Sequence, residues 1–378
     1  MTRRLRVCVL TSVHPPLDTR VFHRQAKSMA AAEFDVLMIA PGAPADPVSR
    51  VRFASLPEWG GRAGRPLRWP VLMAKALRAR ADVYHFHDPE LLPWGLLLKW
   101  ISGRPVIYDS HEYLREDILG KHWIPAALRK PVAFISDRIE KWVARHLSAV
   151  VVVTEEMATR FAPYQDDVVT VKNLPPSPIL PDPLPERQPV VIYAGLMNVE
   201  RGLDILEETA RLVRERHPEC EFHILGTVEW HGMPAGSAER SAEDWTARGI
   251  HFLGTAPQPE VAGMLVAAAC GWLPRSPHAA NNLLAWPNKL VEYMVVGLPV
   301  VASDLPLQAQ VVNDADCGFV VEALSPRAHA DAICAVLDDP VEAARLGENG
   351  RRVAQEQYTW EGESAKLRSL YLRLVRAR

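Results

Sequence analysis

A lysine and a glutamate three positions apart carry the chemistry that stands out in this sequence. Lys289 and Glu292 lie in a stretch that predicts a short helix, because Pro287 suits a first helical turn and Gly297 suits a left-handed helix end. A helix N-terminus with an ammonium in its first turn suits a diphosphate, and a carboxylate one turn later can accept hydrogen bonds from two ribose hydroxyls. A solvated Lys–Glu pair would give the same spacing, so the periodicity leaves both interpretations open.

The two faces of this predicted helix differ in chemistry. At about 100° per residue, Lys289 and Glu292 share a face with Tyr293 and Val296. The opposite face is apolar and comprises Leu290, Val291, Met294 and Val295. We expect the apolar face to pack against a core and the first face to offer its cation and its carboxylate.

A second loop has the residue types of a phosphate site. Gly195 lies at a turn after an apolar run and would let the backbone approach a ligand, and Arg201 precedes a helical pattern and would favour phosphate. The spacing matches neither the dinucleotide-binding fingerprint G-x-G-x-x-G nor a P-loop. A surface arginine beside a turn glycine would look the same. Together with Lys289, however, these residues indicate a site for a nucleoside diphosphate.

The elements that must position these residues alternate between strands and helices. Short apolar runs occupy residues 5–11, 34–40, 82–87, 105–109 and 149–154, and then 190–194, 221–225, 250–253, 268–273, 298–302 and 318–321. With helical patterns between them, these runs predict right-handed βαβ units and two parallel sheets. Residues 175–189 hold seven prolines and predict a linker. We therefore expect domains at 1–174 and 190–360, with a helix at 361–378 that packs back on the first domain.

Polar residues just past the strand ends line the ligand crevice of such sheets. In the first predicted domain these residues are His14, Asp18, Arg20, His87, Asp88, Asp109, Ser110, His111, Glu112 and Thr154. Alternation along the strand makes His85 a core imidazole. Asp314 and Asp316 have the spacing of a metal-binding pair, but they fall on a predicted surface turn, so we expect no metal there.

The composition excludes several classes of protein. A formal net charge of −2 argues against a general nucleic-acid binder. The five cysteines lie far apart, which indicates reduced core residues of a cytoplasmic protein. No run approaches the roughly 18 uninterrupted apolar residues of a membrane span, so any membrane contact must be peripheral. Residues 121–147 are basic and amphipathic, so they could lie on an anionic membrane and reach a lipid-linked acceptor, or form an ordinary packed surface helix.

Four segments together resemble a known family. The stretch 287–303, which contains P-N-K-L-V-E-Y-M and G-L-P-V-V-A-S, resembles the donor-binding helix of retaining GT-B glycosyltransferases of family 4. Residues 195–204 look like the phosphate loop of that family, and residues 14–21 and 108–112 resemble segments of its acceptor domain. The similarity runs from about residue 5 to the C-terminus. It implies the GT-B fold, in which two Rossmann-like parallel-sheet domains face each other across a cleft.

The resemblance also implies roles for individual residues. Arg201 and Lys289, with backbone N–H groups near Gly195 and Asn288, would hold the diphosphate. Glu292 matches the second carboxylate of the family's E-x7-E motif, which binds the ribose hydroxyls.

Other positions match the reacting sugar and the base. His111 matches the active-site histidine that faces the donor sugar, and the loop with Leu253 and Gly254 would face the base. Family members retain the anomeric configuration by front-face attack, with the leaving phosphate as the base, and most need no metal. The resemblance therefore implies no cofactor beyond the donor substrate.

The sequence departs from the family pattern at two places. Leu284 stands where the first glutamate of E-x7-E belongs, so sugar recognition must differ, and Asn281 or Asn282 could substitute for that carboxylate. Leu196 stands where many members have an arginine, which leaves fewer cations for the phosphates. Both departures leave the identity of the donor open.

The sequence thus predicts a cytoplasmic enzyme that moves a sugar from a nucleotide-diphosphate sugar to a glycan, lipid-linked or small-molecule acceptor with retention of configuration. Membrane association on the cytoplasmic face would involve residues 121–147, and we expect no nucleic-acid partner. Two alternatives remain. One is a nucleotide-sugar epimerase on the same fold, and the other is a non-catalytic subunit that binds nucleotide sugars.

Overall fold

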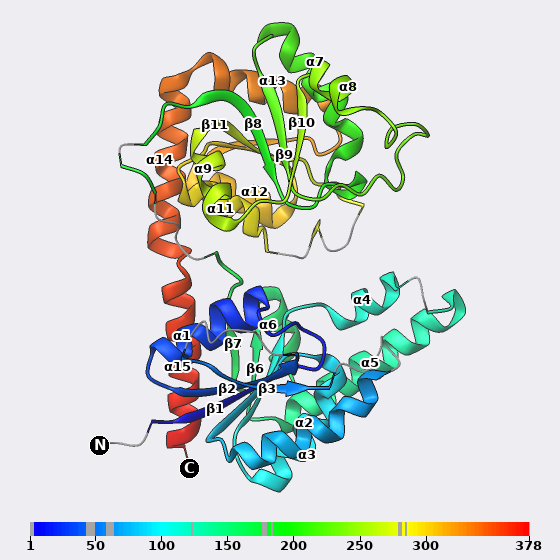
Figure 1. The fold of residues 1–378 in the computed structure, drawn as a ribbon, viewed down its shortest axis with the longest axis vertical. Helices are drawn as coiled ribbons and strands as arrows, with labels where there is room; N and C mark the ends of the chain where they lie inside the picture. The colour runs from blue at the N-terminus through cyan, green and yellow to red at the C-terminus, as the bar shows by residue number, and fades with distance from the viewer. Residues whose placement is uncertain are drawn as a thin grey trace. The chain divides into compact units, whose positions relative to one another are not determined.

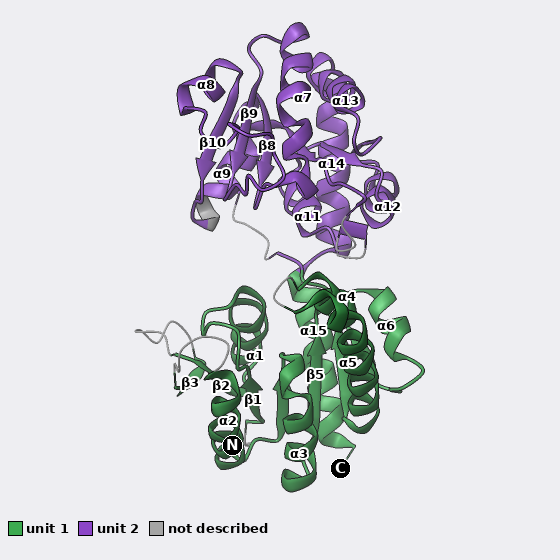
Figure 2. Cartoon of the chain, turned by 90° about the vertical axis from the view of Figure 1, so that its right-hand side faces the viewer, with its two compact units in different colours: residues 1–173, 360–378 green, residues 174–359 purple. Residues whose placement is uncertain are grey.

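The computed structural model describes residues 4–42, 50–57, 64–121, 124–175, 180–182, 184–278, 282–283 and 286–377. The chain forms two compact units (Figure 2). Unit 1 comprises residues 1–173 together with residues 360–378, and unit 2 comprises residues 174–359. The C-terminal segment therefore belongs to the same unit as the N-terminal half of the chain.

Unit 1 is built on a parallel sheet with the strand order β3-β2-β1-β4-β5-β6-β7 (Figure 1). Its strands are β1 (Arg6–Leu10), β2 (Asp35–Pro41), β3 (Arg52–Leu56), β4 (Val83–Phe86), β5 (Val106–Ser110), β6 (Ala149–Val152) and β7 (Val168–Thr170). The sequence predicted five of these strands. It missed the two edge strands, because β3 mixes Arg52 and Ser55 with its apolar residues and β7 is only three residues long.

The helices of unit 1 cover both faces of this sheet. They are the π-helix η1 (Thr19–Ala26), α1 (Lys27–Ala31), α2 (Arg65–Ala79), the 3-10 turn η3 (Pro89–Leu91), α3 (Leu92–Ser102), α4 (Leu114–Gly120), α5 (Ala126–His146), α6 (Glu155–Phe161) and α15 (Trp360–Arg376). One large core cluster contains residues of α2, α3 and α5, and a second contains residues of η1, α1 and α15. The last helix of the chain is thus part of the core of unit 1.

The start of η1 positions a buried arginine. The Asp18 carboxylate accepts hydrogen bonds from the backbone N–H groups of Arg20 and Val21, both at 2.8 Å, and so caps the helix. Because the cap fixes the first turn, the Arg20 side chain enters the interior, where it is only 6% exposed. A helix was predicted here from the apolar periodicity, but the π-helical first half was not.

Unit 2 repeats the architecture with the strand order β10-β9-β8-β11-β12-β13. Its strands are β8 (Gln188–Ala194), β9 (Glu221–Leu225), β10 (Ile250–Gly254), β11 (Ala268–Leu273), β12 (Val300–Ser303) and β13 (Gly318–Val321). Its helices are η4 (Val199–Arg201), α7 (Leu203–Arg216), α8 (Ala242–Ala247), α9 (Gln258–Ala267), α11 (Asn288–Val295), α12 (Pro306–Ala315), α13 (Pro326–Asp338) and α14 (Pro340–Gln357). All six strands were predicted, although β8 begins inside the expected linker. Among the described helices of both units, none is long and apolar enough to cross a membrane.

Helix α11 is buried on more of its surface than the sequence predicted. It begins after Pro287 and ends before Gly297, whose φ of 69° is the expected left-handed conformation. Tyr293 was expected on the open face, but its side chain is fully buried and its hydroxyl accepts a hydrogen bond from the Ala194 N–H at 3.0 Å. Gly271 on β11 makes this possible, because a Cβ there would lie 2.4 Å from the tyrosine ring.

Candidate functional site

Both sheets contain the same switch in strand order. In unit 2, β8 and β11 lie side by side although β9 and β10 separate them in the sequence. In unit 1, β1 and β4 are neighbours in the same way. Connections diverge at such a point, and open parallel sheets bind ligands in the crevice outside the carboxyl ends of these strands.

In unit 2, Lys289 stands at this switch point in the first turn of α11. Its Nζ atom lies 5.6 Å from the ring centre of Tyr193, near the end of β8. Burial, together with the positive charges of Arg201 and Arg275, outweighs the opposing effect of the Glu292 carboxylate and lowers the pKa of Lys289 to about 8. The predicted pair Lys289 and Glu292 is therefore close enough to interact, and both side chains are partly buried.

Two arginines complete a cluster of three cations with Lys289. Arg201 ends η4, and its Nη1 donates to the Leu196 carbonyl oxygen at 3.1 Å. Arg275 lies two residues after β11, and burial and the charge of Arg201 both lower its pKa. Holding three cations together in a partly buried place is costly unless an anion neutralises them. The cluster therefore suits a ligand with several negative charges, such as a diphosphate.

Gly195 allows the lysine to approach the end of β8. Its φ of 135° lies outside the range that residues with side chains readily adopt. A Cβ at Gly195 would lie 1.7 Å from the Nζ atom of Lys289, so the ammonium fills the space that any other residue would need. Gly195 was predicted to let a ligand approach the backbone, but in the structure the side chain of Lys289 makes that close approach.

The remaining predicted donor-site residues lie around the same sheet edge. The Oδ1 atom of Asn288 is buried and has no hydrogen-bond partner among the described residues. Asn282 donates from Nδ2 to the carbonyl oxygens of Glu200 at 2.7 Å and Ser276 at 2.9 Å, so its amide hydrogens hold two loops together. If Asn282 replaces the missing carboxylate, it must therefore do so through its Oδ1 atom, which can accept hydrogen bonds as a carboxylate does.

The residues predicted to form a loop that faces the base, Leu253 and Gly254, are instead the last two residues of strand β10. Leu253 is 41% exposed, and Gly254 has a φ of 68° and accepts a hydrogen bond from the Gly226 N–H at 2.6 Å. Leu284 and Asn281, which bear on the departure from the E-x7-E motif, lie outside the described residues.

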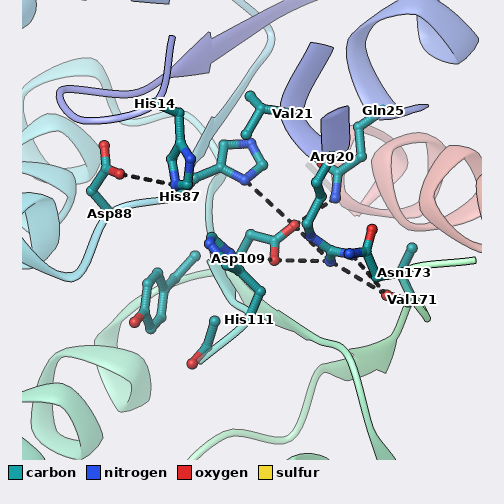
Figure 3. Close-up of polar contacts among 12 residues, drawn as sticks. His14, Arg20, Val21, Gln25, His87, Asp88, Asp109, His111, Val171 and Asn173 are labelled. Atoms are coloured by element: carbon teal, nitrogen blue, oxygen red, sulfur yellow. Dashed lines mark hydrogen bonds and ion pairs between the residues drawn. The ribbon is translucent and has the colours of Figure 1, made fainter. Parts of the chain in front are cut away.

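In unit 1, the predicted crevice residues meet around the Asp109 carboxylate. Figure 3 shows the side chains of Arg20, His87 and His111 converging on it. Nη2 of Arg20 donates to both carboxylate oxygens at 3.0 Å, and Nε2 of Gln25 donates to Oδ2 at 2.6 Å. Burial would raise the pKa of Asp109, but the Arg20 charge and the neighbouring imidazoles outweigh it and hold that pKa well below its usual range.

Three imidazoles surround this ion pair. Nδ1 of His87 and Nδ1 of His111 each lie 3.5 Å from an oxygen of Asp109. His85 lies on the α15 side, where its Nδ1 is 2.7 Å from the Tyr371 hydroxyl. Burial lowers the pKa of His85 to about 4 and that of His87 well below its usual value, so both rings are neutral at pH 7. The prediction that His85 belongs to the core is confirmed by its complete burial.

His14 and Asp88 form a second polar pair beside these rings. Nε2 of His14 lies 3.4 Å from Oδ1 of Asp88, and its Nδ1 lies 3.4 Å from Oδ2 of Asp18. Burial opposes the charged imidazolium of His14, but the carboxylates of Asp18, Asp88 and Glu112 prevail and raise its pKa. His14 is therefore the imidazole of this group whose surroundings favour a positive charge.

A cavity of about 490 Å³ opens beside these residues. Its polar lining includes His14, His87, Asp88, Glu90 and His111. Its apolar lining comes from α3, α4, α5 and the segment between the last two, and includes Leu92, Ile118, Ile124, Val132 and Ile139. The cavity is thus lined both by groups that can hydrogen-bond to hydroxyl groups and by apolar side chains that can contact hydrocarbon.

Two groups of described residues have ligand atoms close enough to hold a metal ion. Ligand atoms of His85, His87 and Asp109 lie within 4.8 Å of one another. The Asp109 carboxylate, however, already accepts hydrogen bonds from Arg20 and Gln25, so a guanidinium occupies the role of the cation. The second group, Glu221, His223 and His251, lies at the opposite strand ends of unit 2 from the cations. Asp316, of the pair with metal-binding spacing, directly follows α12 and forms an ion pair with Arg345 at 2.5 Å.

Comparison with known proteins agrees with this arrangement. Residues 188–339 match the family model "Glycosyl transferases group 1", and residues 19–174 match the model "Glycosyl transferase 4-like domain". The chain belongs to the GT-B glycosyltransferases of group 1. The family expected from four sequence segments, and the fold of two Rossmann-like parallel-sheet domains, are therefore confirmed.

Similar proteins include both transferases of known name and solved structures. This glycosyltransferase is 26% identical over 335 residues to an MMP α-(1→4)-mannosyltransferase of Mycolicibacterium hassiacum, covering 85% of this chain and 78% of that one. It is 23% identical over 370 residues to a phosphatidyl-myo-inositol mannosyltransferase of Mycobacterium leprae, covering 92% and 90%. The structure of HepE from Anabaena in complex with UDP and glucose superposes with a TM-score of 0.70 at 15% identity, covering 97% and 99%, and shows the shared fold.

Sequence reasoning missed some residues that the glycosyltransferase gathers at these sites. Arg275 adds a third cation beside Lys289 and Arg201, in a loop for which the comparison of Leu196 with the family had suggested fewer cations. It follows the predicted strand 268–273, so the rule that selects polar residues after strand ends would have found it had it been applied to the second domain. Gln25 gave no such signal, because it lies in the middle of a helical pattern and reaches Asp109 only through the fold.

Proposed function

We propose that this glycosyltransferase moves a sugar from a nucleotide-diphosphate sugar to a hydroxyl group of a glycan, lipid-linked or small-molecule acceptor, with retention of the anomeric configuration. The observation that carries the proposal is the cluster of Lys289, Arg201 and Arg275 at the switch point of unit 2. Such a cluster matches the charge of a diphosphate, and Glu292 one turn along α11 is suited to a ribose.

The cations would act most strongly on the departing group. When the bond between the anomeric carbon and the distal phosphate oxygen breaks, negative charge grows on the diphosphate. Lys289, Arg201 and Arg275 are already held in place, so they stabilise that charge without reorganising. In a retaining transfer the acceptor oxygen bonds to the same face of the anomeric carbon, and its proton passes to the leaving phosphate oxygen.

Unit 1 would bind the acceptor and would supply the histidine that contacts the donor sugar. The Asp109 carboxylate lies 3.5 Å from Nδ1 of His111 and so favours a hydrogen on that nitrogen. The other ring nitrogen of His111 is then available as a hydrogen-bond acceptor for a sugar hydroxyl. Arg20 and Gln25 hold Asp109 in turn, which makes them positioning residues.

The names of similar proteins suggest which donors to test first. The Anabaena HepE structure contains UDP and glucose, and two relatives are named mannosyltransferases. A panel of UDP-, GDP- and dTDP-linked glucose and mannose, with and without cell extract as acceptor, would therefore be assayed for transfer and for free nucleotide. Conversion of the donor without any acceptor would instead indicate an epimerase, and nucleotide binding without turnover would indicate a non-catalytic subunit.

Variants at the donor site test the assignment directly. Lys289→Ala and Glu292→Ala should each lower turnover at least about a hundredfold while the circular dichroism spectrum stays unchanged. His111→Ala should lower kcat more than donor affinity. Lys27→Ala, at an exposed lysine of α1, serves as the control and should retain full activity. Full activity of either donor-site variant would refute the proposal, and NMR of the product anomer would test retention.

A further inference from the structure

Helix α5 of unit 1 carries an apolar stripe that faces away from the core. Leu128, Val132, Ile135, Ile139 and Trp142 follow one another at intervals of four and three residues, so they share one side of the helix. Their exposed fractions lie between 37% and 55%. Such a stripe normally faces a core, but here the core side of α5 is formed by other residues, namely Ala133, Val143 and Ala144.

The charges of α5 are sorted between its sides. Its acidic residues face inward, where Asp137 pairs with Lys141 and Arg160, each at 2.7 Å, and Glu140 pairs with Arg160 at 2.5 Å. The outer side keeps basic residues beside the apolar stripe, and these are the exposed Arg138 and Arg145. An exposed apolar stripe with a basic flank and a tryptophan is complementary to the interface of an anionic bilayer.

The stripe is continuous with the cavity that contains His111. Val132 and Ile139 belong to both, because they line the cavity and lie in the exposed stripe. The cavity therefore leads from the imidazole of His111 and the carboxylates of Asp88 and Glu90 to the outer surface of α5. A molecule that filled it would place a hydroxylated head at the histidine and a hydrocarbon tail along the helix.

We propose that α5 docks on an anionic lipid bilayer and that the acceptor is a lipid with a hydroxylated head group, which enters the cavity from that bilayer. This inference rests on the proposed transfer and narrows its acceptor to a single class. The continuity of the stripe with a cavity of about 490 Å³ favours a lipid over a partner helix, because a helix would cover the stripe without using the cavity.

Vesicle sedimentation tests the docking surface without any catalysis. The full chain should sediment with vesicles of phosphatidylcholine and phosphatidylglycerol in a ratio of 7:3, and at least about tenfold more weakly with pure phosphatidylcholine. The double variants Ile135→Ser/Trp142→Ser and Arg138→Glu/Arg145→Glu should each weaken binding to the anionic vesicles at least about tenfold. Val341→Ser, at an 81% exposed apolar residue of α14, is the matched control and should bind as the wild type does.

Two glucosides that have the same head group but different alkyl chains test whether the cavity binds a hydrocarbon tail. Octyl β-D-glucoside, used below its micelle concentration, should bind at least about tenfold more tightly than methyl β-D-glucoside in saturation-transfer NMR, because only the octyl chain reaches the apolar lining. Ile139→Gln should reduce that ratio severalfold, and Val341→Ser should not. Equal affinity of the two glucosides would overturn the tail site.

Measurements of nucleotide binding distinguish a failure of this inference from a failure of the proposed function. UDP and GDP affinities would be measured on the same samples, and the α5 variants should leave them unchanged. Vesicle binding without any nucleotide binding would refute the proposed transfer but support the docking surface. Nucleotide binding with no preference for anionic vesicles would overturn the inference, as would self-association that is abolished by Ile135→Ser/Trp142→Ser in the absence of lipid.

Discussion

The ammonium of Lys289 occupies the space that a side chain at Gly195 would need, since a Cβ there would lie 1.7 Å from Nζ. These residues are far apart in the sequence, and each is predicted to take part in donor binding. Their contact couples the turn after β8 to the first turn of α11. A change at the glycine should therefore act through the lysine.

Gly195→Ala should displace Lys289 and strain the backbone at φ 135°. We expect UDP or GDP affinity to fall at least about tenfold and stability to fall by about 1–3 kcal/mol. Titration calorimetry and urea unfolding would measure the two effects. Gly236→Ala is the control, because its φ is 87° but nothing lies within 4 Å of the added Cβ. If both variants bound nucleotide equally well, the displacement of the lysine would have no consequence for the ligand.

Nucleotide binding should depend on pH through Lys289. Its pKa is lowered to about 8 in the free protein, so below pH 8 the ammonium is already present to meet a phosphate. Above that pH the lysine must take up a proton when the anion binds, and affinity should fall by about tenfold per pH unit. Calorimetry between pH 6.5 and 9.5 would show the decline.

Lys289→Arg provides the comparison for this pH profile, because a guanidinium stays charged throughout the range. Its affinity for the same nucleotide should not decline above pH 8. Ionisation of the nucleotide itself affects both proteins equally. A parallel decline in the two proteins would mean that another group controls the binding.

Arg275 should contribute to binding as much as the two cations that the sequence identified. Arg275→Leu removes a charge–phosphate interaction worth about 1.5–3 kcal/mol, so nucleotide affinity should fall about 10- to 100-fold. Arg275→Lys should restore part of the loss. Arg345→Leu, which removes an exposed cation that pairs with Asp316, should leave affinity unchanged. Unaltered binding by Arg275→Leu would remove this residue from the site.

The buried ion pair of Arg20 and Asp109 should be essential to unit 1. Asp109→Asn leaves the guanidinium uncompensated in the interior, and we expect a loss of about 3–5 kcal/mol in the free energy of unfolding. Asp35→Asn, which breaks an exposed pair with Arg52, should cost less than about 1 kcal/mol. Urea titration compares the two variants. Adding Arg20→Met to Asp109→Asn should recover part of the stability, and a further loss instead would contradict the ion-pair explanation.

The sequence determined most of the fold because local patterns specify parallel sheets well. Apolar runs that alternate with amphipathic helices gave all six strands of unit 2, and the edge strands escaped because β3 mixes polar with apolar residues and β7 is only three residues long. The face of α11 that carries Tyr293 was misassigned for a different reason. Periodicity separates the faces of a helix, but it does not show how many neighbours will cover them.

The residue types at each site also came from the sequence, whereas their partners came from the tertiary structure. Lys289, Glu292 and His111 were identified from their place after strands and at helix starts. The strand order brings Arg275 to Lys289, and the packing of helices on the sheet brings Gln25 and Arg20 to Asp109 and Tyr371 to His85. Which side chains meet at a sheet edge depends on strands that are distant in the chain, and burial shifts the pKa of Lys289 only once those strands have packed. Local sequence contains neither the pairing nor the burial, so only the folded chain could decide them.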